Sequence, residues 1–441
     1  MATTLATAAE AHHPLLGRLR EARVQTDDLF EIIRPEALYD RPIAERHRLV
    51  FYIGHLEAFD HNLLAPELGL EAFQPHFDRL FAFGIDPLGS GLPADKPSDW
   101  PALEEIRGYR DRARIRLDER ITKSTVPSDG RQAHLLHVAI EHRLMHAETL
   151  AYLLHQLPLD SKKTLPQPRE LERPTVTRRM IEIPAGRATL GAQRPEDHGG
   201  FFGWDNEFEA QAVEVPGFAI DAHNVTNGQF LEFVQAGGYR ERSLWSEAAW
   251  GWIESRGVRH PRFWLRQREA WWYRTMFDQR PLPLDWPVYV SQAEASAYAC
   301  WAGKALPTES QFHRAAYGTP EGGEREYPWG NEPPDERRGN FDFQRWHPVA
   351  VGAHPAGRSA FGVDDLVGNG WEWTASVFEP LPGFEPFTFY PGYSANFFDG
   401  KHYVMKGASS RTAGCLLRRS FRNWFQPHYP FIYAAFRCVA N

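Results

Sequence analysis

The chain has 441 residues, of which 42% are hydrophobic and 24% charged, and its formal net charge is -8 at pH 7. This composition is typical of a soluble globular protein, and the length predicts two or three domains. The acidic balance argues against a nucleic-acid-binding surface, and the sequence lacks the run of about 18 apolar residues that would predict a membrane span.

The cysteines and the N-terminus both indicate an intracellular protein. Cys300, Cys415 and Cys438 make neither a disulfide framework nor a CxxC metal pattern. The first residues, MATTLATAAEAHHPLL, lack the charged segment and the long apolar segment of a signal peptide. We therefore expect a cytoplasmic location.

The first third of the chain has helical periodicity. Amphipathic helices are predicted in four segments, over 15–33, 44–64, 98–121 and 132–157. The third should begin at Ser98 or Asp99, just before Pro101. Four helices of this length can close around one core, so a four-helix bundle is expected.

The fourth of these segments carries two histidines where core residues should be. His142 and His146 fall on a stripe that also contains Leu135, Val138 and Leu153, and they are one helical turn apart. Two inward imidazoles can share a cation. The alternative is a pair of core histidines that bond to carbonyl groups or to each other.

The second segment repeats this feature. His55 lies on the face of Phe51, Tyr52 and Phe59, and Gly54 beside it allows another group to approach closely. A single histidine there would usually be a core residue, but three inward histidines on two helices favour a metal site. Neutral imidazoles suit iron, copper, zinc or nickel, and three ligands leave coordination positions open.

Other candidate ligands near these histidines are off the shared helix face or at its margin. They are Glu57, Asp60, His61 and Glu148, and we expect them to be solvated surface residues.

The second part of the chain has a different texture. Residues 158–179 combine prolines and charges without a hydrophobic period, which predicts a linker. Beyond it, residues 181–192 alternate like a pair of strands, 213–234 predict a strand followed by a helix, and 291–303 and 305–318 predict short helices. Short strands and long glycine- and tryptophan-rich loops indicate an α+β domain with much irregular structure.

Six ordered motifs occur in this region: Ile183-Pro-Ala-Gly, Asn224-Val-Thr-Asn-Gly-Gln-Phe, Ala305-Leu-Pro-Thr-Glu-Ser-Gln-Phe, Tyr327-Pro-Trp-Gly-Asn, Gly368-Asn-Gly-Trp-Glu-Trp-Thr and Ala435-Phe-Arg-Cys. Together they resemble the formylglycine-generating-enzyme (sulfatase-modifying factor) fold, a C-type-lectin-like module. The motif from Gly368 to Thr374 is expected to be structural, since it recurs in lectin-like domains of different function.

The spacing of His55, His142 and His146 resembles that of the DinB-like domain. The two domains in this order resemble the ergothioneine-synthase family of nonheme iron enzymes. The resemblance implies an α+β multidomain protein, with a DinB-like helical bundle over 1–157, a linker over 158–179 and a formylglycine-generating-enzyme-like domain over 180–441. It also implies that the three histidines bind Fe(II) at the domain junction, where O2 is activated and a chalcogen donor is joined to imidazole C2 of hercynine.

One segment of the second domain departs from the family pattern. The sulfoxide synthases of this family have Arg-Asn-Trp-Asp, and this chain has Arg422-Asn423-Trp424-Phe425. The resemblance gives Asn423 and Trp424 catalytic and hercynine-binding roles. A trimethylammonium group prefers aromatic faces, so Trp424, Phe425 or the loop of Tyr390 and Tyr393 can form part of its cage. Phe425 replaces the acid that helps to bind γ-glutamylcysteine.

The helical domain departs from the pattern as well. Arg110 keeps one thiol-binding arginine, whereas the second such position holds Ala113, and Met145 replaces the glutamine that precedes the last ligand. We therefore predict a substrate site that includes Arg110, Met145 and Phe425 but has lost much of its peptide-thiol pocket.

These departures favour a different donor. The segment that begins at Phe51, FYIGHLEAFD, resembles the selenoneine-synthase branch, which uses a selenosugar, and Phe425 can stack against a sugar ring. The alternatives are an ergothioneine- or ovothiol-type sulfoxide synthase that uses γ-glutamylcysteine or cysteine, and a non-catalytic lectin-like binding protein. A formylglycine-generating oxidase would need a reactive cysteine pair, but only Cys415 lies in the relevant region.

Overall fold

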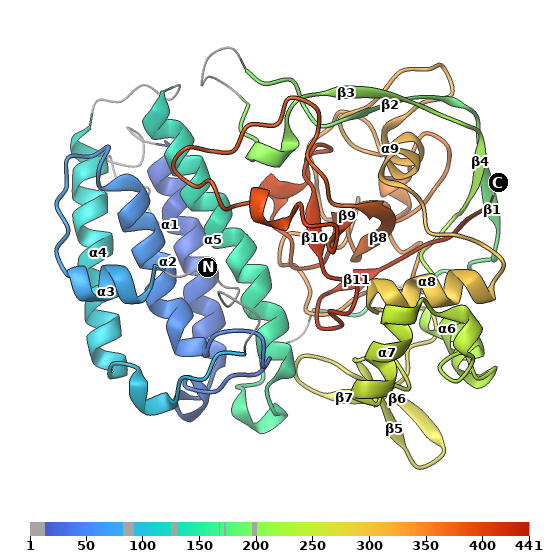
Figure 1. The fold of residues 1–441 in the computed structure, drawn as a ribbon, viewed down its shortest axis with the longest axis horizontal. Coiled ribbons are helices and arrows are strands. Elements are labelled where there is room, and N and C mark those ends of the chain that lie inside the picture. Colours follow the sequence, from blue (N-terminus) through green and yellow to red (C-terminus); the bar gives the residue numbers. More distant parts are fainter. Residues whose placement is uncertain are drawn as a thin grey trace. The chain divides into compact units, whose positions relative to one another are not determined.

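The computed structural model describes residues 14–82, 92–124, 130–166, 168–171, 173–195 and 201–440. The chain forms two compact units (Figure 1). One consists of Met1–Leu165 and Pro195–Phe202, and the other of Pro166–Arg194 and Gly203–Asn441. The first is helical and the second mixes short helices with strands, so the predicted α+β multidomain class is confirmed.

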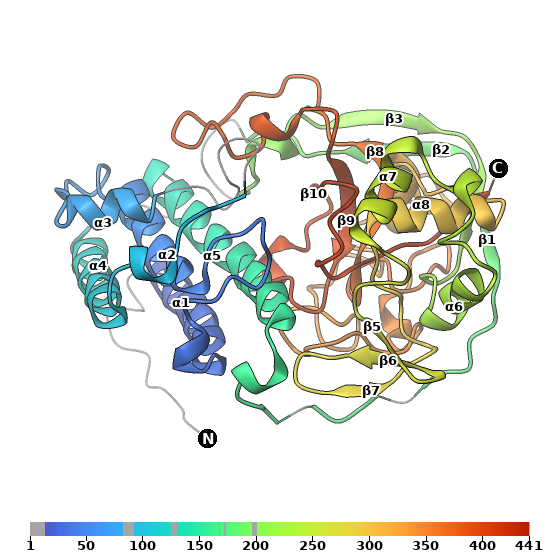
Figure 2. The same cartoon turned by 60° about the horizontal axis from the view of Figure 1, so that its bottom comes forward.

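The helical unit is a bundle whose long helices run alongside one another (Figures 1 and 2). Its helices are α1 (Pro14–Ile32), α2 (Leu49–Leu64), the short α3 (Pro75–Leu80), α4 (Leu103–Lys123) and α5 (Arg131–Gln156). Helix α5 packs against α1 and α2, and α4 packs against the same two helices. The bundle core includes fully buried leucines such as Leu16, Leu117 and Leu153. No helix in the described part of the chain is both long and apolar enough to cross a bilayer.

Two helices begin later than predicted. Helix α2 starts at Leu49 and not at residue 44, because Arg48 is extended and its guanidinium donates to Asp95 Oδ2 (3.0 Å) and to the Tyr39 carbonyl (2.7 Å). The predicted start of α4 at Ser98 or Asp99 is also wrong, because Pro97–Asp99 forms a separate 3-10 turn.

The second unit contains four small sheets in the part that the structure describes. In spatial order the strands are β1 (Met180–Ile183), β4 (Phe218–Asp221) and β12 (Val439–Ala440); β10 (Asn423–Phe425), β9 (Tyr403–Ala408), β8 (Gly370–Val377) and β11 (Ala434–Ala435); β2 (Gly186–Leu190) and β3 (Gln211–Val215); and β5 (Trp264–Gln267), β6 (Ala270–Arg274) and β7 (Gln279–Pro281).

Strands β1 and β2 both form, but they do not pair with each other. Strand β1 pairs with β4, and β2 pairs with β3. The register is continuous across the interruption, since Ile183 lies opposite Phe218 and Gly186 lies opposite Val215. Proline cannot donate a ladder hydrogen bond, so Pro184 and Pro216 divide one long two-stranded ribbon into two pairs.

The short helices of this unit are α6 (Asn227–Gln235), α7 (Glu247–Arg256), α8 (Gln292–Trp301) and α9 (Glu309–Tyr317). Three of them begin with a capping box, in which an N-cap hydroxyl and a glutamine or glutamate three residues later satisfy two backbone N–H groups. The N-cap residues are Thr226, Ser291 and Thr308. Helices α8 and α9 lie within the predicted segments 291–303 and 305–318, and α6 ends one residue beyond the predicted segment 213–234.

A buried ion pair joins two of the sequence motifs. Arg437 Nε and Nη2 each donate to a carboxylate oxygen of Glu372 at 2.7 Å, and both side chains are fully buried. Arg437 also donates to the carbonyl groups of Asp221 (3.1 Å) and Asp364 (2.8 Å). The Gly368–Thr374 motif therefore has a structural role, because its glutamate anchors the C-terminal strands.

We expect Arg437→Ala to destabilise the second unit by about 3–5 kcal/mol, because it leaves the Glu372 carboxylate buried without its partner. Thermal unfolding followed by near-UV circular dichroism measures the change. Arg178→Ala is the control, since the Arg178 side chain is 59% exposed and its ion pair with Glu232 contributes little. Equal unfolding temperatures for the two variants would contradict this role of Arg437.

Candidate metal centre

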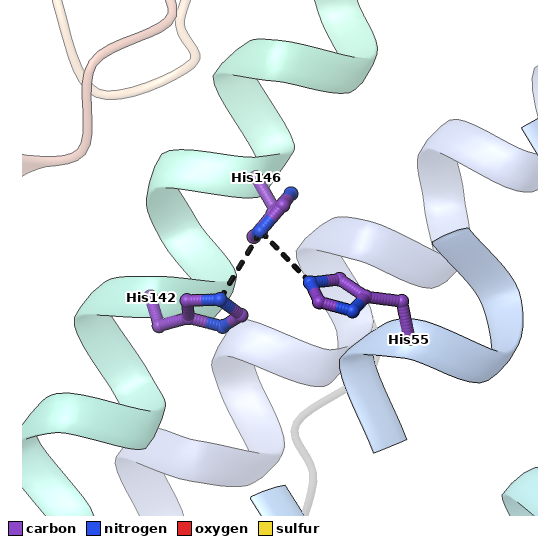
Figure 3. Close-up of side chains that lie close together, drawn as sticks. All are labelled: His55, His142 and His146. Carbon is purple, nitrogen blue, oxygen red and sulfur yellow. Dashed lines mark hydrogen bonds between the residues drawn. The ribbon is translucent and has the colours of Figure 1, made fainter. Parts of the chain in front are cut away.

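Three histidines from two helices converge in the core of the bundle (Figure 3). Helix α2 supplies His55, and α5 supplies His142 and His146 from successive turns. His146 Nε2 lies 3.3 Å from His55 Nε2 and 3.1 Å from His142 Nε2. All three side chains are buried. The sequence prediction that these residues face one another is confirmed.

The surroundings of His55 determine which nitrogen faces the cluster centre. Its Nδ1 lies 2.8 Å from the Phe81 carbonyl oxygen. A carbonyl oxygen only accepts hydrogen bonds, so Nδ1 carries the proton and the Nε2 lone pair points to the other histidines. Burial lowers the pKa of His55 to about 4, and burial also lowers the pKa of His142 and His146 well below the ordinary value. All three rings are therefore neutral near pH 7.

These distances fit a shared metal ion. Two nitrogens that each lie about 2.1 Å from one ion are about 3.0–3.4 Å apart. Hydrogen bonding among the rings accounts for the arrangement less well, because a neutral His146 has one N–H and its Nε2 faces two other Nε2 atoms. One cation satisfies all three lone pairs. The residues present thus suit a metal that accepts neutral nitrogen ligands.

Aromatic rings hold two of the imidazoles in place. Phe51 stacks on His55 with a centroid distance of 4.9 Å, and Phe59 stacks on His142 at 3.4 Å. Gly54 allows the close approach that its position predicted: a Cβ atom there would lie 2.5 Å from the Phe81 ring. The absence of that side chain lets Phe81 pack against α2 with its carbonyl on His55.

The prediction that four neighbouring residues are solvated is wrong for Glu57, Asp60 and His61. Glu57 is 1% exposed, Asp60 0% and His61 2%, whereas Glu148 is partly buried. Charged groups are rarely buried without a partner. Here Arg143 supplies one, since its guanidinium donates to Glu57 Oε1 (3.1 Å) and Asp60 Oδ2 (2.6 Å).

Two predicted substrate residues of the helical unit lie outside the cluster of ring nitrogens. Arg110 is on α4, which supplies no histidine to the cluster, and its Nε donates to the exposed Asp111 at 2.8 Å. Met145 is partly buried on α5, directly before His146. Ala113 is fully buried in the bundle core. The substrate-binding roles of Arg110 and Met145 remain predictions.

Strand β10 carries the other predicted site residues, Asn423, Trp424 and Phe425, all partly buried. Side chains alternate along a strand, so Trp424 points away from the face shared by Asn423 and Phe425. The ring contacts agree with this alternation, because Phe425 stacks on Tyr429, with a centroid distance of 5.2 Å, whereas Trp424 stacks on Phe378.

Trp424 belongs to an aromatic cluster. It stacks on Phe378 with a centroid distance of 4.2 Å, and Tyr393 and Phe397 lie at 5.5 and 5.6 Å. Of the aromatic groups proposed for a trimethylammonium cage, Trp424 and Tyr393 therefore lie together, and Phe425 belongs to a different stack. Their roles in substrate binding remain predictions.

The cysteines give no support to a reactive pair. Cys415 and Cys438 are not joined by a disulfide bond. Cys438 is buried, and burial raises the pKa of its thiol. A buried neutral thiol is a poor nucleophile, so the arrangement expected of a formylglycine-generating oxidase is not observed at these residues.

The sequence analysis missed two groups near the histidines. One is the backbone carbonyl of Phe81, which lies 26 residues from His55 and leaves no trace in side-chain patterns. The other is Arg143, whose position between His142 and His146 was a usable signal. A charged residue next to core positions of a buried helix needs a buried counter-ion, and Glu57 and Asp60 were available on the partner helix.

Comparison with known proteins gives consistent matches. Residues 164–441 match the family described as the sulfatase-modifying factor enzyme 1-like domain. The chain is 36% identical over 367 residues to a hercynine oxygenase of Mycolicibacterium smegmatis, which covers 80% of this chain and 81% of that protein. It is 42% identical over 236 residues to a hercynine oxygenase of Mycobacterium tuberculosis, covering 53% of this chain and 55% of the relative.

A fungal relative matches over most of the chain. The ergothioneine biosynthesis protein 1 of Neurospora crassa is 28% identical, and the match covers 93% of this chain and 56% of that protein. The chain thus spans about half the length of this relative and of the Mycobacterium tuberculosis one. The domain match and the long match to the Mycolicibacterium smegmatis protein show that the chain belongs to the ergothioneine-synthase-like family, whose members carry a sulfatase-modifying factor enzyme 1-like domain.

Proposed function

We propose that this protein is a nonheme Fe(II)- and O2-dependent enzyme that joins a chalcogen donor to imidazole C2 of hercynine. The observation that carries the proposal is the convergence of three buried, neutral Nε2 atoms from His55, His142 and His146. The names of the relatives, hercynine oxygenase and ergothioneine biosynthesis protein 1, support hercynine as the acceptor.

In this proposal the three histidines hold Fe(II) as neutral ligands, and the bound ion supplies O2 activation and open positions for substrates. The Phe81 carbonyl fixes the tautomer of His55, and Phe51 and Phe59 shield the ligand rings from water. The protein's contribution is to hold donor, imidazole and O2 together, which turns a reaction of three molecules into a local one.

The chemistry balances with O2 as the oxidant. The C2–H bond of the imidazole and the Se–H or S–H bond of the donor break, and a bond forms between C2 and the chalcogen. Together with oxygenation of the chalcogen, these changes release four electrons, which O2 accepts. One oxygen atom stays on the chalcogen and the other leaves as water with the two hydrogens.

Hercynine is proposed to bind at Asn423 and Trp424. Its trimethylammonium group would lie against aromatic faces, and Trp424 is already grouped with Phe378, Tyr393 and Phe397. The Asn423 Oδ1 atom accepts from the Trp424 backbone N–H at 2.9 Å, which orients the carboxamide so that Nδ2 can donate to the substrate carboxylate.

The donor is proposed to be a selenosugar, which makes the enzyme a selenoneine synthase. A sugar has no carboxylate to bind, and the residues at the corresponding positions suit this: Phe425 stacks on Tyr429, Ala113 is in the core, and Arg110 is paired with Asp111. The second candidate is a sulfoxide synthase that uses γ-glutamylcysteine or cysteine, and the names of the relatives favour it.

Anaerobically purified wild-type protein should bind about one equivalent of Fe(II), and His142→Ala should bind at least about tenfold more weakly because one of three ligands is lost. Metal analysis after desalting measures this. His76→Ala is the control, because His76 is exposed on α3 of the same unit. Absence of bound iron in the wild type would support a non-catalytic binding protein with structural histidines.

Gly54→Ala should weaken Fe(II) binding by about tenfold without unfolding the bundle, because its methyl group would displace Phe81 and with it the carbonyl that orients His55. Competition with a chelator of known affinity measures the change. Gly17→Ala on α1 has nothing within 4 Å of the new Cβ atom, so it should leave iron binding unchanged. Equal affinities for both variants would argue against the role assigned to Phe81.

The donor is identified by incubating the iron-loaded enzyme with hercynine, O2 and one of three donors: a selenosugar, γ-glutamylcysteine or cysteine. Mass spectrometry should detect a coupled product with the selenosugar at a rate at least about tenfold higher than with either thiol. Phe425→Asp should increase the use of γ-glutamylcysteine, because it restores an acceptor for the donor's ammonium group. Product formation from the thiols alone would overturn the selenosugar assignment.

A further inference from the structure

Arg143 is a fully buried arginine between two proposed ligands, His142 and His146, on α5. We propose that it is a positioning residue, which holds α2 and α5 in the one register that brings His55 to His142 and His146. This inference rests on the proposed metal centre and adds to it a residue that binds neither metal nor substrate.

The contacts of Arg143 connect the two ligand-bearing helices next to the ligands. Its Nη2 donates to the Leu56 carbonyl (3.0 Å) and to Asp60 Oδ2 (2.6 Å), and its Nη1 donates to Glu57 Oε1 (3.1 Å). Leu56 directly follows His55, as Arg143 directly follows His142. Arg143 is therefore one residue away from a proposed ligand on α5, and one of its three acceptors on α2 is one residue away from His55.

The hydrogen-bond network around Arg143 and Glu57 also includes residues of the other two long helices, α1 and α4. Arg114 of α4 donates to Glu57 Oε1 (2.7 Å) and to both carboxylate oxygens of Asp27 on α1 (2.6 and 2.8 Å). Arg143 also contacts Thr26 Oγ1 of α1 at 3.3 Å. Although burial opposes its ionisation, Arg143 and Arg114 lower the pKa of Glu57 to about 2. All four long helices of the bundle thus meet at one set of directional contacts.

Stability alone does not explain this cluster. Apolar side chains of similar volume usually stabilise a core as well as a buried ion cluster or better, because burying charges requires their desolvation. Directional hydrogen bonds instead favour one register between two helices over registers shifted by one or more residues. A slip of α2 by one residue would move His55 by about 1.5 Å along the axis and rotate it by about 100°, which would break the convergence of the Nε2 atoms.

The test separates register from stability with the double variant Arg143→Met/Asp60→Leu, which removes one positive and one negative charge and leaves Glu57 paired with Arg114. Anaerobic titration with Fe(II) and with Co(II) measures affinity, and circular dichroism measures thermal unfolding. We expect the double variant to unfold within a few degrees of the wild type but to bind metal about 10–100-fold more weakly.

Arg131→Met is the matched control, because Arg131 lies on the same helix but forms a surface ion pair with Glu67, and its metal affinity should equal that of the wild type. Arg143→Lys keeps the charge without the planar fork, so it should fold and also bind metal at least about tenfold more weakly. A folded double variant or lysine variant with wild-type affinity overturns the inference and leaves the metal centre intact. A wild-type protein that binds no metal contradicts the proposed function itself.

Discussion

The helical unit depends on one constraint, the burial of three neutral imidazoles whose ring nitrogens face one another. His146 Nε2 is within 3.3 Å of both other Nε2 atoms, a spacing that suits nitrogens sharing one ion. Burial keeps the rings uncharged, and the Phe81 carbonyl determines which nitrogen of His55 remains available. The residues around the site therefore serve to orient ligands and not to supply charge.

A cluster of buried charges lies beside the three histidines, with Glu57 and Asp60 on α2 and Arg143 on α5. Arg143 and Arg114 form ion pairs with the buried acids Glu57 and Asp60, so each of these buried charges has an opposite charge beside it. A cation held by these histidines would keep its full charge, because the three imidazole rings are neutral. Such a centre would favour anionic or electron-rich ligands at its open positions.

Much of this arrangement followed from local sequence patterns. Period and spacing predicted four helices and the inward positions of His55, His142 and His146, because helical geometry relates residues three and four apart whatever surrounds them. The start of α2 was missed because it depends on Arg48 meeting Asp95, a contact between distant residues. The burial of Glu57 was missed for the same reason: its partners, Arg114 and Arg143, lie on other helices.

In the second unit, too, the sequence predicted candidate site residues but not the contacts around them. Asn423 and Trp424 were identified from a motif, but motif letters do not indicate that strand alternation separates Trp424 from Phe425. That separation gives the two aromatic residues independent surroundings, one with Phe378 and Tyr393 and the other with Tyr429. A substitution at residue 425 can therefore alter the face of strand β10 that Phe425 shares with Asn423 without disturbing the aromatic cluster around Trp424.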